Sequence, residues 1–265
     1  KANTQAVKLT TNMTGIFHPH GIALQKDIKG EGKALYVVNH ISPSEHAIEI
    51  FDITEPGSLK HRRSVSYPEM ISPNDLVVVA KDQFFVTNDH GYEHNTLMNK
   101  LEDYLGLAQS SVTYFDGSQG HIIIEGLSMA NGIELSLDQQ TLYVAETLAR
   151  KVSRYRRGDS ITDWIYQDSV SVEFAVDNLE WHGADELLVA GHPKAFDFLA
   201  HVSDNSSLAP SEVAKINVSG EQMKAQTIYR NAGEELSGAS VAAQQGDTLL
   251  IGPVVEPHFL RCKTK

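Results

Sequence analysis

The sequence predicts an all-β protein of the β-propeller type, and a short pattern that occurs five times is the first observation behind this prediction. A small or kinking residue comes before a polar residue and an apolar run, and a second apolar strand follows. The five openings lie at residues 19–22, 73–76, 130–133, 176–179 and 238–241. They recur at intervals of about 45 to 60 residues, which is near the length of propeller blades.

The second halves of the units are the second observation. Each is short, rich in β-branched or aromatic residues and bounded by turn residues, as strands are. These second strands are expected at residues 34–38, 83–87, 141–145, 186–190 and 248–252, and third strands at 47–51 and 111–115.

The scarcity of helix candidates is the third observation, because a parallel α/β fold needs long amphipathic helices between its strands. The best candidate, residues 97–107, is interpreted as an insertion between strands. The basic run at 151–157 alternates with apolar residues and predicts an exposed strand face rather than a binding patch.

Composition favours one globular domain over residues 1–265, with 41% hydrophobic residues to form its core. The net charge of −12 argues against nucleic acid as a partner, since binding phosphates needs clustered Lys and Arg. No apolar run approaches the ~20 residues of a transmembrane helix. Three glycosylation sequons, at 12–14, 205–207 and 217–219, lead us to expect a secreted glycoprotein.

Oxygen donors occupy the equivalent polar place in several units. They are Asn74, Asp75, Asn131, Asp177 and Asn178. Around one axis these side chains would converge, and a set of carboxylate and amide oxygens suits a hard cation such as calcium rather than zinc. The alternative is that each begins a strand as a turn or cap residue. Repetition across units favours the cation site.

Two histidines belong to the same geometry. His20 opens the first unit and His40 ends its second strand, so adjacent strands would bring both to one end of the channel. Because histidine titrates near neutrality, one ring could act as general base while the other relays its proton. A pair of surface histidines is the alternative in a chain with twelve. His90 and His192 also follow second strands and are expected at the same mouth as His40.

In these residues the chain resembles the paraoxonase/arylesterase family of calcium-dependent lactonases, whose fold is a six-bladed β-propeller. The matching segments occur in the family's order along nearly the whole chain. They are PHGI at 19–22, VVNH at 37–40, ND at 74–75, TNDH at 87–90, YLGLA at 104–108, ANGI at 130–133, YVAE at 143–146, VDN at 176–178, HP at 192–193 and LIG at 250–252.

The resemblance implies two calcium ions and assigns residues to each. The ligands of a catalytic calcium would be Asn74, Asn131, Asp177 and Asn178. Asp75 and the backbone carbonyl of Ile22 would hold a second, structural calcium. The catalytic ion would polarise the substrate carbonyl and stabilise the oxyanion as it forms.

The resemblance also implies an activity. His20 and His40 would be a dyad that activates water to open a lactone, with aryl esters and organophosphates as further substrates. His192 and Met129 would line the substrate pocket. Met129 stands where the family leads us to expect an aromatic residue, so the substrate range is open.

One departure concerns the beginning of the chain. The family starts with a further segment that carries most of the first blade, the strand that closes the ring and an acidic pair that ligates both ions. That segment also carries a cysteine that would form a disulfide with Cys262, the single cysteine here. About five blades' worth of sequence and one unpaired cysteine lead us to expect that this segment is cleaved, left out or supplied by another chain.

Two other functions remain open. A gluconolactonase-like sugar lactonase would use a similar axial metal but would prefer a sugar-acid lactone. A non-catalytic propeller would bind a protein partner on its face and show no dependence on metal.

Overall fold

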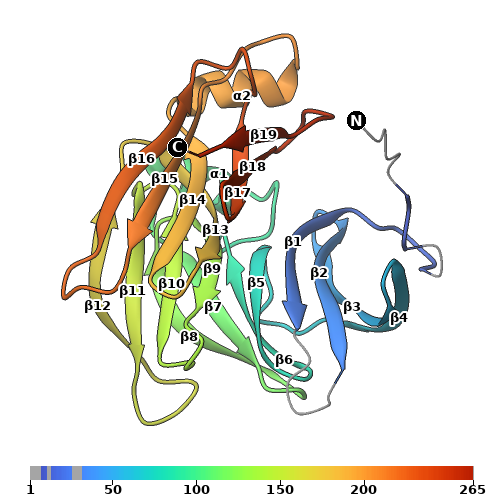
Figure 1. Ribbon diagram of the computed structural model, residues 1–265. Helices are drawn as coiled ribbons and strands as arrows, with labels where there is room; N and C mark the ends of the chain where they lie inside the picture. Colours follow the sequence, from blue (N-terminus) through green and yellow to red (C-terminus); the bar gives the residue numbers. More distant parts are fainter. Residues whose placement is uncertain (1–6, 11–12, 26–31, 265) are drawn as a thin grey trace.

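The computed structural model describes residues 7–10, 13–25 and 32–264. Its strands form five antiparallel sheets in chain order, and Figure 1 shows these sheets arranged around a common centre. The prediction of an all-β propeller with about five blades in this chain is therefore confirmed.

Each sheet uses strands that are consecutive in the sequence. The first contains β1 (Pro19–Gln25), β2 (Lys33–Ser42), β3 (Glu45–Glu55) and β4 (Ser58–Val65). The second contains β5 (Pro73–Ala80), β6 (Gln83–Asn88), β7 (Ser110–Phe115) and β8 (Gly120–Leu127). The third contains β9 (Ala130–Leu135), β10 (Thr141–Glu146), β11 (Lys151–Arg157) and β12 (Trp164–Ser171). The fourth contains β13 (Ala175–His182), β14 (Glu186–His192), β15 (Ser211–Asn217) and β16 (Lys224–Asn231). The fifth contains β17 (Ala239–Gln245), β18 (Thr248–Pro253) and β19 (Leu260–Lys263).

The core lies between neighbouring sheets. The first strands pack against one another in the order β1, β5, β9, β13 and β17, which makes them the innermost strands. Four clusters of buried apolar side chains fill the spaces between successive sheets. Alternation along each strand sends one face to each of these clusters, which explains why the second strands are apolar almost throughout.

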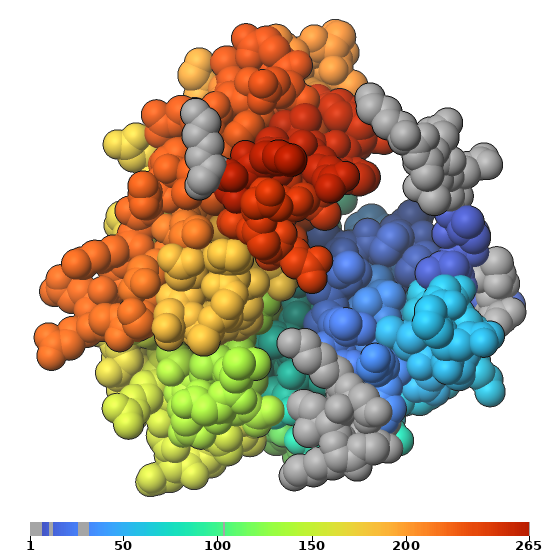
Figure 2. Space-filling view, viewed as in Figure 1, coloured from blue at the N-terminus to red at the C-terminus, as the bar shows by residue number. Residues whose placement is uncertain are grey.

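The first and fifth sheets are the two ends of this series. Figure 2 shows a gap between the blue segment of β1 and β2 and the red segment of β17 to β19. Apolar side chains on both sides of the gap are accessible, with Ile22 61%, Leu24 54% and Val241 37% exposed. The described sheets therefore surround a central space that is open on one side.

Two short helices interrupt the sheets. α1 (Leu97–Leu105) lies between β6 and β7, where an insertion is predicted, and the Thr96 side chain caps its first turn by accepting a hydrogen bond from the Asn99 amide at 3.2 Å. α2 (Ala195–Ser203) connects β14 to β15 and is not predicted by the sequence patterns. In the described part of the chain, no helix is long and apolar enough to cross a membrane.

The basic run forms the strand β11, as predicted. Its apolar residues are buried, Val152 between the third and fourth sheets and Tyr155 between the second and third. Of its basic residues, Arg156 is exposed and the other three are partly buried. Arg154 holds both carboxylate oxygens of Asp168, at 2.7 and 2.8 Å. The same guanidinium also donates to three backbone carbonyls that follow β15, at Val218, Gly220 and Glu221. Arg154 therefore joins the third sheet to the segment that follows β15 of the fourth sheet.

Polar bonds also tie the sheets together near the centre. The three bonds are Thr87 Oγ1 to the Asn131 carbonyl (2.7 Å), Thr147 Oγ1 to the Val176 carbonyl (2.7 Å) and Asn178 Nδ2 to the Ser240 carbonyl (3.2 Å). They join the second sheet to the third, the third to the fourth and the fourth to the fifth. Each carbonyl belongs to one of the repeated openings.

Thr87→Val should lower the free energy of unfolding by about 1–3 kcal/mol, because it leaves the buried carbonyl of Asn131 without its donor. Urea denaturation of both proteins measures the change. Thr162→Val, at an exposed turn, is the matched control and should change stability by less than about 0.5 kcal/mol. Equal stability of wild type and Thr87→Val would show that the bond does not stabilise the fold.

Candidate functional site

Each repeated opening coincides with a break in strand register. The pairing of first and second strands shifts between Pro19 and Ile22, between Pro73 and Leu76, between Val176 and Leu179, and between Ala239 and Val241, and opposite residues 130–133 it shifts on β10. A bulge redirects side chains out of the regular alternation. The bulge therefore turns the polar side chain of every unit away from the regular alternation at the equivalent position.

Glycines let the openings approach one another. A Cβ atom on Gly21 would lie 2.5 Å from the Asn74 carbonyl oxygen and 2.7 Å from Asp75 Oδ1. A Cβ on Gly132 would lie 2.7 Å from the Asp177 carbonyl oxygen and equally close to Asn178 Cα. These positions accept glycine alone because backbone, which cannot move aside, occupies the space.

The openings of all five sheets line one cavity of about 1660 Å³. Its polar lining includes His20, Asn74, Asp75, Asn131, Asp177, Asn178 and Ser240. The residues expected in a substrate pocket, His90, Met129 and His192, line it as well, together with apolar side chains of α2. The structure thus brings together the residues that the repeat singles out.

Two amide oxygens in this cavity lack partners. Asn74 Oδ1 and Asn131 Oδ1 are buried and accept no hydrogen bond from the described residues. The Asn74 nitrogen, Nδ2, donates to Asp89 Oδ2 at 3.3 Å, so the amide oxygen is the atom left over. Buried polar atoms without partners are rare, and a hard cation would satisfy both oxygens.

Asp177 contributes a carboxylate to the same set. Its Oδ2 lies 3.3 Å from His192 Nε2, and its Oδ1 accepts a hydrogen bond from Asn178 Nδ2 at 3.1 Å. Both Asp177 and His192 are buried. Among Asn74, Asn131, Asp177 and Asn178, Asp177 alone carries a formal charge, and this oxygen set fits a cation of the calcium type.

Asp75 lies against the backbone of β1 at Gly21, the residue before Ile22. Its Oδ2 accepts a hydrogen bond from the Ile133 amide at 3.1 Å. Burial raises the pKa of Asp75 to about 7, and the charges of Asp177 and Glu180 add to the rise. A positive ion next to this carboxylate would remove the penalty for its ionisation.

The two histidines of the first sheet are in contact. His20 Nδ1 lies 3.0 Å from His40 Nε2, and His40 Nδ1 lies 3.0 Å from His46 Nδ1. Sequence reasoning missed His46, although it stands directly opposite His40 across the β2–β3 hairpin. His20 is exposed and His46 is buried, so the three rings run from the cavity into the protein.

The prediction that His40, His90 and His192 lie at the same opening was wrong, because they line two different cavities. His20 lines the large cavity and also a smaller one of about 580 Å³, whereas His40 lines only the smaller. His90 and His192 line only the larger. His20 is thus the histidine through which the pair reaches the cavity that contains the oxygen set.

The wall of the large cavity is partly apolar. The His192 ring stacks on Phe198 of α2, with ring centroids 3.6 Å apart. Met129 is half-buried and holds a left-handed backbone conformation with φ of 59°, which is uncommon outside glycine and asparagine. The cavity therefore offers polar groups at its centre and carbon surface at α2.

The state of His40 should appear in the pH dependence of stability. Burial first, and the neighbouring His20 and His46 next, lower the pKa of His40 from 6.5 to about 4. The unfolded chain therefore binds more protons than the folded chain between these values, so the free energy of unfolding falls as pH decreases from 6.5 to 4. His40→Gln should lose less stability over this range, as measured by denaturation at several pH values. Parallel curves for the two proteins would contradict the lowered pKa.

Comparisons with known proteins identify relatives over most of the chain. The chain is 34% identical to human serum paraoxonase/arylesterase 1 over 245 residues, which covers 90% of this chain and 66% of that protein. It is also 34% identical to serum paraoxonase/lactonase 3 of Oryctolagus cuniculus over 241 residues, with the same coverage. The chain thus spans slightly less than two thirds of the length of these relatives.

Solved structures share the fold at low sequence identity. One is a gluconolactonase from Xanthomonas campestris, with a TM-score of 0.52, 16% identity and coverage of 90% of this chain and 84% of that one. Another is a nidogen/laminin complex, with a TM-score of 0.55, 12% identity and coverage of 89% and 72%. The Arylesterase family profile matches residues 1–263, and the chain belongs to the paraoxonase/arylesterase family.

Proposed function

We propose that the protein is a calcium-dependent hydrolase that opens lactones and also cleaves aryl esters. One observation carries the proposal: two unpartnered amide oxygens, of Asn74 and Asn131, line the same cavity as His20 of the histidine pair. A cation site and a group that accepts a proton are the two requirements for attack of water on an ester carbonyl.

The ligands of the proposed catalytic calcium are Asn74, Asn131, Asp177 and Asn178, and Asp75 with the Ile22 carbonyl would hold a second ion. When bound, the first ion would supply positive charge that polarises the substrate carbonyl and stabilises the oxyanion. Asn74 keeps its oxygen available because its nitrogen is committed to Asp89. Ser240 holds the Asn178 amide nitrogen at 2.9 Å, which leaves that oxygen available too.

The histidines would move the proton of the attacking water. The low pKa of His40 keeps its ring neutral near pH 7, so its Nε2 can accept a hydrogen bond from the Nδ1–H group of His20. His20 Nε2 is then free to take a proton while the water oxygen bonds to the carbonyl carbon. Collapse of the oxyanion breaks the ring C–O bond, and the leaving alkoxide takes that proton to give the hydroxy acid.

The apolar wall would hold the rest of the substrate. Phe198, stacked on His192, and Phe196, which is 87% exposed, belong to α2 at the edge of the cavity. Burying an acyl or aryl group on this surface would favour binding by about 25 cal/mol for each Å² removed from water. We expect lactones and esters with apolar substituents to be better substrates than sugar-acid lactones.

Hydrolysis of a δ-lactone by the purified protein tests the proposal, first with excess calcium and then after chelation. Activity that the chelator abolishes and calcium restores is the expected result. A rate that chelation leaves unchanged would refute the calcium requirement. Gluconolactone in the same assay tests for a sugar lactonase, and inactivity on every substrate, in protein of correct mass that melts cooperatively, would favour a propeller that binds a partner.

We also propose that the protein is secreted and glycosylated. Asn205 and Asn217, the acceptors of two sequons, are both exposed, as attachment of a glycan requires. Asn12, the acceptor of the third, lies outside the described residues. Cys262 has no disulfide partner among the described residues, and a partner for its thiol in another segment or chain remains a prediction. Intact-mass measurement before and after enzymatic deglycosylation would test the glycans.

A further inference from the structure

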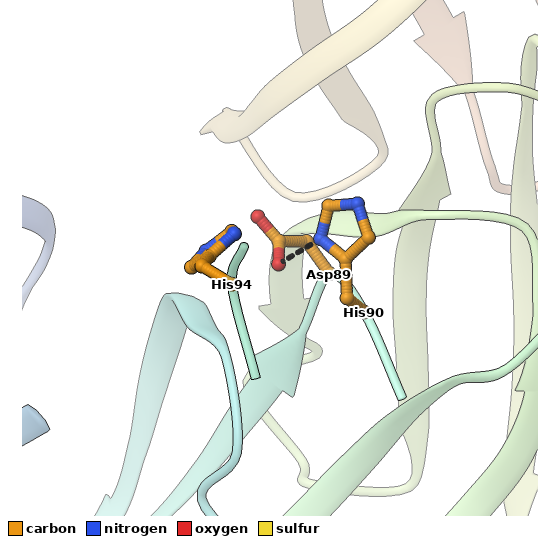
Figure 3. Close-up of side chains that lie close together, drawn as sticks. All are labelled: Asp89, His90 and His94. Carbon is orange, nitrogen blue, oxygen red and sulfur yellow. Dashed lines mark hydrogen bonds and ion pairs between the residues drawn. The ribbon is translucent and has the colours of Figure 1, made fainter. Parts of the chain in front are cut away.

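Asp89, His90 and His94 bring three metal-binding atoms together beside the oxygen set but outside it. One nitrogen of each histidine and one carboxylate oxygen all lie within 4.8 Å of one another. Figure 3 shows the Asp89 carboxylate between the two imidazole rings. The side chains follow the end of β6, where the chain turns towards α1.

The chemistry of this cluster differs from that of the axial cavity. Two imidazole nitrogens and one carboxylate are ligands typical of zinc and related transition metals, which commonly take four ligands. Calcium prefers oxygen ligands alone, as Asn74, Asn131 and Asp177 would supply. The molecule therefore presents two donor sets that select different classes of cation.

The three side chains are oriented by hydrogen bonds. His90 Nδ1 lies 2.7 Å from Asp89 Oδ1. The buried Ser72 hydroxyl donates to Asp89 Oδ1 and lies 3.0 Å from His94 Nε2. These bonds hold the carboxylate and both imidazole rings close together.

The cluster can be reached from the smaller cavity. Asp89 and His94 line this space of about 580 Å³, together with His40 and His46. An ion bound by three protein ligands therefore has an open side towards the cavity, where water or His46 can complete its coordination.

We propose that Asp89, His90 and His94 form a binding site for one divalent transition-metal ion of the zinc type, separate from the calcium set. The proposal does not depend on hydrolase activity, because it concerns metal binding alone. The two sets meet at one bond, in which Asn74 Nδ2 donates to Asp89 Oδ2 at 3.3 Å.

Titration calorimetry with zinc chloride, on protein kept in excess calcium, tests the proposal. Wild type should bind one zinc ion per chain at this site. Removing a metal ligand should lower zinc affinity at least as much as removing a hydrogen bond that supports a ligand. His94→Ala should therefore weaken zinc binding by more than ~10-fold. His121→Ala is the matched control, because His121 also pairs with an aspartate, Asp116 at 3.1 Å, but no third metal-binding side chain joins them among the described residues.

Cobalt(II) supplies a second measurement. In a site with nitrogen ligands and four-fold coordination it should give visible absorption bands that wild type and His121→Ala show and His94→Ala lacks. Ser72→Ala removes the hydroxyl that contacts both Asp89 and His94, and it should lower zinc affinity about 10–100-fold. This variant replaces His94→Ala in the test if His94→Ala does not melt cooperatively.

Three outcomes would overturn the proposal. One is the absence of zinc binding by folded wild type. Another is equal zinc affinity of wild type and folded His94→Ala. The third is zinc that is lost in His20→Gln but retained in His94→Ala, which would place the ion at the His20–His40 pair. Each outcome leaves the calcium-dependent assay of lactone hydrolysis unaffected, so failure of this proposal and failure of the proposed function are distinguishable.

Discussion

Asp177→Asn should remove calcium-dependent stabilisation and reduce lactone hydrolysis at least ~100-fold. Displacing a group that stabilises charge in the transition state raises the activation free energy by several kcal/mol. The amide keeps the size of the side chain but removes the only formal negative charge among Asn74, Asn131, Asp177 and Asn178. Calcium affinity depends strongly on how many ligands are charged. The variant also loses the charged partner of His192, 3.3 Å away.

Melting curves with and without calcium measure the first effect. An ion at about 100 times its dissociation constant stabilises the folded state by about 2.7 kcal/mol, and this increment should disappear in Asp177→Asn. Asp197→Asn, on the accessible surface of α2, is the control and should keep the increment. An equal rise in melting temperature for wild type and Asp177→Asn would exclude Asp177 as a calcium ligand.

His20→Gln should lower kcat for lactone hydrolysis by about 10²–10⁴-fold, which is the usual contribution of a general base. Glutamine can retain a hydrogen bond to His40 but cannot accept the proton of water at pH 7. Because His20 is exposed, the melting temperature should not change. Steady-state kinetics and thermal denaturation on the same preparation separate the two effects.

The control for this variant is His258→Gln, which alters an accessible histidine near the end of the chain. Its kcat should equal that of wild type. Full activity of His20→Gln would refute the role of the pair, and a large fall in melting temperature would show that His20 supports the fold rather than the reaction.

Much of the fold could be predicted because its signals are local. Each strand opening carries its own turn residues, and α1 has a capping threonine, Thr96, just before its first residue. α2 was missed although Ala195, Phe198, Leu199 and Val202 have helical spacing, because the segment AFDFLAHVS is only nine residues long and a short apolar run does not distinguish helix from strand. Phe196 and Leu199 are exposed at the cavity, so the helix does not bury one apolar face in a core.

The candidate site could be predicted only where its residues belong to the repeat. His20 and His40 contact each other because β1 and β2, consecutive strands of one sheet, pair antiparallel with Pro19 opposite Asn39. The cluster of Asp89 with His94 depends on a turn after β6, and Ser72 reaches it from the segment before β5. Nothing in the spacing of these residues fixes the path of that turn.

The bonds that join the innermost strands have a consequence for chimaeric proteins. Thr87 of one sheet donates to the Asn131 carbonyl of the next, and Asn178 reaches Ser240 in the same way. A whole blade exchanged with a relative would bring one half of each bond and leave the other behind. A crossover between β9 and β10, inside the third blade, would separate neither Thr87 from Asn131 nor Asn178 from Ser240. The unit to be recombined in this propeller is therefore the junction between neighbouring blades rather than the blade.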